Sequence, residues 1–197
     1  GDALTDADYN VAIGYAALTG DTKGSNSVAI GYETLLAQNF TTATDSLNVA
    51  VGYRAGTAVT TARGNTLVGS AAGDALTVGN ANVAMGYNSL GGDTKGDRNV
   101  AIGYEALLTQ NFTTSTDSYN TAVGFHAGTA ITTGIYNTLV GGLAGDALTD
   151  ADYNVAIGGN ALGQNTVGSR IVAVGYGALT SHNPATATDT YNTAVGM

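Results

Sequence analysis

The hexapeptide Asn99-Val100-Ala101-Ile102-Gly103-Tyr104 recurs with small changes from one end of the 197-residue chain to the other. Its glycine falls at positions 14, 31, 52, 69, 86, 103, 124, 141, 158, 175 and 196. Successive glycines are therefore 17 or 21 residues apart, and the order 17, 21, 17, 17 repeats every 72 residues. A fixed period of this size is typical of solenoids and other repeat arrays.

The 72-residue unit is visible directly, since Gly1 to Asn10 and Gly145 to Asn154 are identical. No linker or change of composition divides the chain. We therefore expect one all-β domain over residues 1–197, a parallel β-solenoid of eleven coils. Because solenoids need capping ends and both ends here fall inside a repeat, the chain is expected to be a piece of a longer one.

The composition narrows the class of partner. Fifteen acids against six bases give a net charge of −9, and charged residues make up only 11% of the chain. Nucleic acids and anionic lipids need basic patches, so neither is an expected partner. No window is apolar enough to cross a membrane. The low charge predicts that identical chains cover part of the surface, and the absence of cysteine excludes disulfides and thiolate sites.

Each hexapeptide reads as a short strand whose side chains alternate between two faces. The branched residues, such as Val100 and Ile102, are interpreted as the inner wall of the coil. The opposite face carries small uncharged residues and the repeated glycine, so it is the predicted face between chains. Its residues are Ala12, Ala29, Ala50, Ala84, Ala101, Ala122, Ala156, Ala173 and Ala194, with Leu67 and Leu139 as larger variants.

Three further rows follow from the same alignment. An asparagine precedes the glycine by four residues in most coils and suits a corner or a hydrogen-bonded ladder. Leucine or glycine occurs four residues after the repeated glycine. The leucines are predicted to form a second core ladder, and the glycines to form tighter corners. An aromatic row follows the glycine, and it either packs between coils or offers a track for sugars. Its members are Tyr15, Tyr32, Tyr53, Tyr87, Tyr104, Phe125 and Tyr176.

The 21-residue coils carry four additional residues, which must bulge outward if the stack is regular. Loops on a rigid scaffold are where binding residues usually collect. The candidate binding residues are therefore Asn39, Phe40, Asn111, Phe112, His182 and Asn183. The alternative is that these loops merely fill a corner of the coil.

No pattern in the chain indicates catalysis, so an enzyme is not expected. The phosphate-binding loop, zinc-ligand spacing and nucleophile elbow are all missing from the sequence. Asp6 and Asp8, with Asp150 and Asp152, could offer carboxylates to calcium, but Val78 and Asn80 replace them in the middle copy. Neither a cofactor nor a metal site is predicted.

The unit Asn-x-Ala-x-Gly-Tyr-x-Ala-Leu, as in Asn99 to Leu107, resembles two groups of proteins. Ser27 to Gly31 is similar to the YadA-like head repeat of trimeric autotransporter adhesins. Asn120 to Ala127 is similar to repeat arrays in phage tail-fibre-like proteins. The resemblance implies a homotrimeric, left-handed parallel β-roll on an extracellular surface or a virion fibre, which attaches to a host glycan or protein. The alternative is a structural filament without a receptor site.

Overall fold

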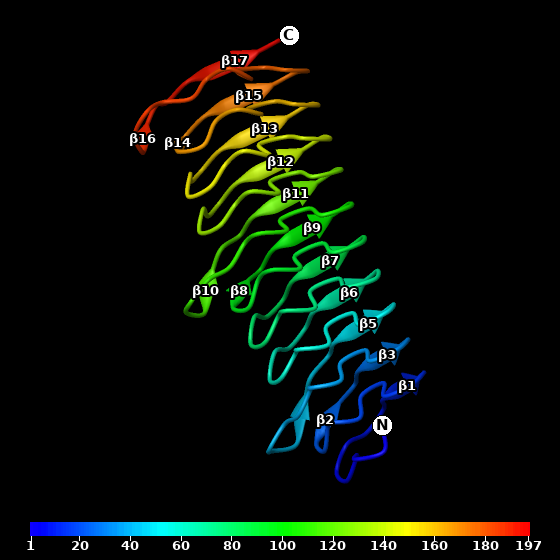
Figure 1. The fold of residues 1–197 in the computed structure, drawn as a ribbon. Helices are drawn as coiled ribbons and strands as arrows, with labels where there is room; N and C mark the ends of the chain where they lie inside the picture. Colours follow the sequence, from blue (N-terminus) through cyan, green and yellow to red (C-terminus); the bar gives the residue numbers. More distant parts are fainter.

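The computed structural model describes residues 1–197, which form strands and turns but no helix. One three-residue strand from each coil joins a single eleven-stranded parallel sheet, here called the main sheet (Figure 1). Its strands in spatial order are β1 Val11–Ile13, β3 Val28–Ile30, β5 Val49–Val51, β6 Thr66–Val68, β7 Val83–Met85, β9 Val100–Ile102, β11 Thr121–Val123, β12 Thr138–Val140, β13 Val155–Ile157, β15 Val172–Val174 and β17 Thr193–Val195. The predicted all-β, parallel β-solenoid is confirmed.

Three pairs of two-residue parallel strands lie away from the main sheet (Figure 1). Each pair joins a 21-residue coil to the coil before it. The pairs are β2 Gly24–Ser25 with β4 Thr44–Asp45, β8 Gly96–Asp97 with β10 Thr116–Asp117, and β14 Gly168–Ser169 with β16 Thr188–Asp189. The additional residues of the long coils therefore recur at one side of the stack, every fourth coil.

Every strand of the main sheet pairs in the same register. Ala101 lies opposite Ala122 on the next coil, and Ile102 lies opposite Val123. The repeat positions therefore form continuous rows along the solenoid. Whatever faces outward on one coil faces outward on all of them.

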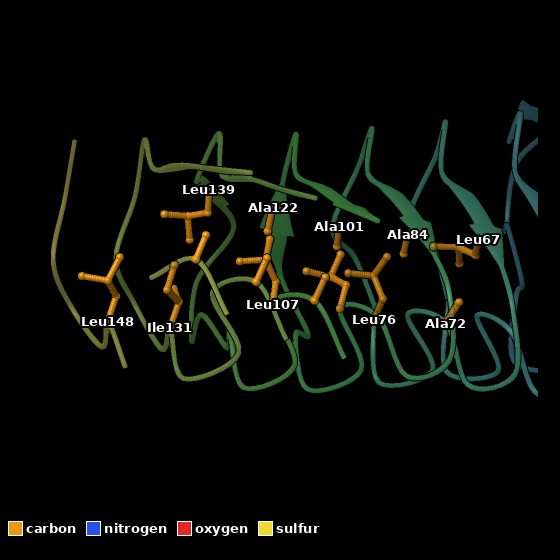
Figure 2. Close-up of a cluster of buried hydrophobic side chains, with 14 of the residues drawn as sticks. Leu67, Ala72, Leu76, Ala84, Ala101, Leu107, Ala122, Ile131, Leu139 and Leu148 are labelled. Atoms are coloured by element: carbon orange, nitrogen blue, oxygen red, sulfur yellow. The ribbon is translucent and has the colours of Figure 1, made fainter. Parts of the chain in front are cut away.

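The two faces of the main-sheet strands are the reverse of those predicted: the face predicted to lie outside is inside the coil. The middle residue of each strand points into the coil, where Ala101 and Leu139 are fully buried (Figure 2). The branched residues that flank it point outward. The row proposed as the face between chains, Ala12, Ala29, Ala50, Ala84, Ala101, Ala122, Ala156, Ala173 and Ala194, is thus an internal row, and only its two end members, Ala12 and Ala194, retain exposure. Ala suits this place because the coil is narrow.

Leucines at the corner across the coil from the strand leave room only for a small residue in the middle of the strand. Leu107 and its equivalents Leu18, Leu35, Leu90 and Leu162 are fully buried and fill the coil against the alanines, whereas Leu179 is only partly buried. Where the strand carries Leu67 instead of alanine, the corner residues nearest it are Gly56 and Gly73. A Cβ atom on Gly56 would lie 2.7 Å from Leu67 Cδ1, and one on Gly73 would lie 2.9 Å from Leu67 Cδ2. Large and small residues therefore alternate across the core to keep it close-packed.

The prediction that the corner glycines form tighter turns is wrong. Gly56 has a φ of 60° and Leu35, its equivalent one coil earlier, has a φ of 48°. Both lie in the left-handed region. The glycine is thus explained by the volume of the neighbouring leucine rather than by the backbone.

The asparagine row forms the predicted hydrogen-bonded ladder. Asn48 Oδ1 accepts hydrogen bonds from the backbone nitrogen of Asn65 at 3.0 Å and from its Nδ2 at 3.3 Å. The Asn65 amide in turn donates to the Gly79 carbonyl oxygen at 3.0 Å. The left-handed corner lies one residue earlier, for example at Arg98 with a φ of 61°. The asparagine therefore acts inside the coil and joins one coil to the next.

Candidate functional site

The outward-facing surface of the main sheet is the largest candidate for interaction. We call it the outer face and define it by the first and third residues of the eleven main-sheet strands. These are Val or Thr in the first row, and Ile, Val or Met in the second. No charged residue interrupts either row. Ile157 is 40% exposed and Val140 36% exposed, although both lie well inside the stack.

The aromatic row after the glycine forms two stacked ladders. Tyr32 lies between Tyr15 and Tyr53, with ring centroids 5.1 and 5.4 Å away. Tyr104 is stacked in the same way between Tyr87 and Phe125. Since the ring faces cover one another, a sugar cannot lie against them within a ladder. The ring edges remain open, because Tyr104 is 45% exposed. The ring faces therefore pack against one another between coils, and only the ring edges form part of the surface.

A second aromatic row, five residues before the glycine, was missed in the sequence. Tyr136 is stacked between Tyr119 and Tyr153, with ring centroids 5.1 Å away on both sides. The guanidinium groups of Arg98 and Arg170 lie over the rings of Tyr119 and Tyr153, 5.6 and 4.6 Å from their centroids. The signal was hidden because the same row carries residues as different as glycine and leucine in the first half of the chain.

The inserted loops differ from the prediction at their phenylalanines. Phe40 and Phe112 are only 5% and 6% exposed, so neither can act as an exposed binding residue. The Phe40 ring folds back onto β2, where its Cδ2 lies 2.9 Å from the place of a Gly24 Cβ atom. Gly24 thus makes room for a ring that would otherwise leave a large apolar side chain in water.

The remaining candidate residues of these loops stay at the surface but are engaged. Asn39 and Asn111 are exposed, and their Oδ1 atoms accept hydrogen bonds from threonine hydroxyls of the preceding coil. Asn183 does the same in the third loop, and the half-buried His182 lies 3.4 Å from the Asn192 amide. The most open parts of the loops are their tips, residues 41–43, 113–115 and 185–187.

A buried carboxylate lies at the base of each of the first two loops. Asp93 Oδ1 accepts the backbone N–H of Gly96 at 2.9 Å, and its Oδ2 accepts Gln110 Nε2 at 2.6 Å. Asp21 makes the same contacts in the first loop. In the third loop Asn165 replaces the aspartate and keeps the bond to the backbone, at 2.9 Å from Gly168 N. The bond to the backbone therefore holds the loop in place, and an uncharged asparagine amide can make the same bond.

Burial raises the pKa values of four carboxyl groups, those of Asp74, Asp93, Asp146 and Asp152. A raised pKa means that the folded chain binds these protons more tightly than the unfolded chain does. The resulting stability is complete below the unfolded value, near 4, and is lost as the pH rises through the folded pKa. We therefore expect the free energy of unfolding to increase when the pH is lowered from 7 toward 4, as measured by urea denaturation.

Asp93→Asn, the residue that the third loop carries at position 165, should make this pH dependence shallower. The exposed Asp6, changed to asparagine, serves as the matched control and should leave the pH dependence unaltered. A stability that falls steadily from pH 7 to pH 5 in the parent chain would contradict the assignment of these buried acids.

No family model, no curated protein and no solved structure matches the chain. No three His, Asp or Glu side chains lie close enough together to hold a metal ion. The structure also has no helix with the length and apolarity needed to cross a membrane.

Proposed function

We propose that this chain is the shaft or head of an extracellular fibre, in which three identical chains pack through their outer faces and which attaches to the surface of a cell. The observation that carries the proposal is the outer face itself. Two rows of uncharged side chains, branched except for Met85, run the full length of the stack, and the single chain leaves them partly open to water. Apolar surfaces of this extent mark interfaces.

The outer face together with the aromatic row that follows the glycine is large enough for a stable assembly. Eleven strands about 4.8 Å apart span about 50 Å, and the five residues from the first strand residue to this aromatic row span about 16 Å. The product, about 800 Å², equals the roughly 800 Å² that each partner buries in a typical specific interface. Three such faces can meet around one axis parallel to the stack, as the resemblance to trimeric adhesin heads implies.

The charge distribution favours a structural role over catalysis. His126 Nε2 lies 3.0 Å from Glu105 Oε2, which is the arrangement most similar to a catalytic dyad in this chain. The same position one super-repeat earlier holds Arg54, whose Nε lies 3.5 Å from Glu33 Oε2. An arginine cannot act as a general base at neutral pH. The pair is therefore interpreted as a structural contact between coils.

The burial of Phe40 and Phe112 favours one specific alternative, a structural filament with no receptor site in its loops. The two proposals differ in what the loop tips do. In an attachment fibre the exposed tips at 41–43, 113–115 and 185–187 contribute to binding, whereas in a filament they are solvated corners.

The first test is the mass of the parent chain in solution. We expect a species of three 19.6 kDa chains in sedimentation equilibrium. Attachment to cells is then compared between the parent chain and a variant with all three tips replaced by Gly-Ser-Gly. Loss of attachment without loss of the trimer would support a fibre that binds through its tips. A monomeric parent chain would overturn the assembly, and unchanged attachment would exclude the tips.

A further inference from the structure

A shallow pocket of about 220 Å³ lies beside the second aromatic row, in the first half of the chain. Asp45, Leu47, Arg63, Gly64 and Asn80 line it. They come from three successive coils, so the pocket is built by the stack rather than by one loop. Its volume is below the range of drug-sized sites, which suits a single ring.

The second half of the chain shows what the pocket lacks. Seventy-two residues after Gly64 comes Tyr136, whose ring is stacked 5.1 Å from both of its neighbours in the row. A Cβ atom on Gly64 would find no other atom nearer than Ala81 Cα, at 4.0 Å. The pocket is therefore a place that a ring fills in the second half of the chain and that Gly64 leaves open, between Leu47 and Ala81 in the same row.

The charge at the pocket is also particular to this copy. Arg63 is the only arginine with no carboxylate oxygen within 4.0 Å, since the other three pair with Glu33, Asp117 and Asp189. Its equivalent one super-repeat later is Ile135. In a chain with a net charge of −9, a free guanidinium beside a ring-sized pocket is suited to bind an anionic oxygen.

The other polar groups of the pocket are held in place by hydrogen bonds. Asp45 Oδ1 accepts a bond from Asn26 Nδ2 at 2.9 Å, which leaves its second oxygen free. Asn80 Oδ1 accepts the backbone N–H of Arg63 at 2.9 Å, and Asn80 Nδ2 donates to Asp97 Oδ1 at 3.1 Å. Groups fixed in advance lose little freedom when a ligand binds. They can accept and donate hydrogen bonds to hydroxyl groups.

We propose that this pocket, here called the Gly64 pocket, binds one pyranose ring that carries a carboxylate, such as a uronic acid unit of a surface polysaccharide. The carboxylate pairs with Arg63, the hydroxyl groups bond to Asp45 and Asn80, and the C–H face of the ring lies on Leu47. This inference rests on the proposed attachment function and names its ligand. Binding to one shallow pocket is weak, and the three pockets of a trimer raise it by multivalency.

The experiment uses the full chain and two soluble probes, methyl glucuronide and its neutral counterpart methyl glucoside, with binding measured by ligand-observed NMR. We expect the glucuronide to bind and the glucoside to bind at least about tenfold more weakly, which is the loss expected for one charge-assisted hydrogen bond. Arg63→Ile should weaken glucuronide binding to the same degree. Gly64→Tyr should abolish it, because the new ring occupies the pocket.

Both substitutions copy residues that the chain itself carries at 135 and 136, so both variants are expected to fold, which circular dichroism checks. Tyr136→Phe, in the filled half of the row, is the matched control and should bind as the parent does. Failure of the parent to bind the glucuronide, equal binding of the two probes, or unchanged binding in Gly64→Tyr would overturn the proposal. Sedimentation of the same samples tests the trimer separately, so failure of the pocket and failure of the fibre are distinguishable.

Discussion

A chain in which Ile102 and Val123 are both replaced by glutamate is expected to run as a folded monomer under conditions where the parent chain forms the proposed trimer. Both side chains point outward and lie on adjacent strands, β9 and β11. In a single chain the new carboxylates stay in contact with water. In a closed interface they would lose that water without gaining a partner, which costs several kcal/mol for each charge. Sedimentation equilibrium measures the difference in mass.

The matched control is Ala101→Glu, because Ala101 is the neighbour of Ile102 in β9 but points into the coil. Ala101 is fully buried, so the glutamate would be forced into the core, and loss of the β signal in circular dichroism is expected. The two variants thus separate assembly from folding. A folded trimer of the double variant would exclude the outer face as the interface.

Gly86→Ala is expected to have the largest effect on the stability of the coil stack. A Cβ atom on Gly86 would lie 2.5 Å from the Gly103 carbonyl oxygen and 2.7 Å from its carbonyl carbon, both part of the next coil's backbone. The residue also has a φ of 132°, which side-chain-bearing residues rarely adopt. The coils must separate locally to accept the methyl group. We expect a loss of roughly 3 kcal/mol or more, in the range of the most damaging single substitutions.

The control for this prediction is Gly142→Ala, in the aromatic row. The nearest atom to a Cβ there is the Phe125 carbonyl oxygen at 4.0 Å, and the residue has no left-handed φ. Thermal unfolding of the two variants should therefore differ by many degrees. Equal melting temperatures would show that the repeated glycine is not needed for close approach of the coils.

The regular spacing of the glycine was sufficient to predict the number of coils and the parallel pairing. Which face of each strand points into the coil could not be predicted in the same way. Val100, Ala101 and Ile102 are all apolar, so the alternation defines two faces but does not say which is inside. The usual expectation, that the larger residues are buried, failed because Leu107 already fills the narrow coil. The fit in size between the strand residue and the corner residue across the coil decides which face is buried. This fit can be seen only in the folded structure.

The candidate binding residues show a similar limit. Phe40 was expected outside because an insertion must bulge, yet a single aromatic ring can fold back over a glycine such as Gly24. The Gly64 pocket could not be found from the sequence, since it depends on a side chain that is missing and on three coils at once. The comparison of Gly64 with Tyr136, at the 72-residue spacing, is the signal that points to it.

The coils bond only to their immediate neighbours, and those bonds run along the long axis of the stack. A stack pulled from its two ends can therefore lose its coils one at a time, because each coil is held only by bonds to its neighbours. Each coil that comes loose releases its own contour length, about 58 Å for 17 residues and about 71 Å for 21 residues. Under tension such a chain behaves as a tether that lengthens in steps and absorbs work with each one, while the coils still stacked keep their shape.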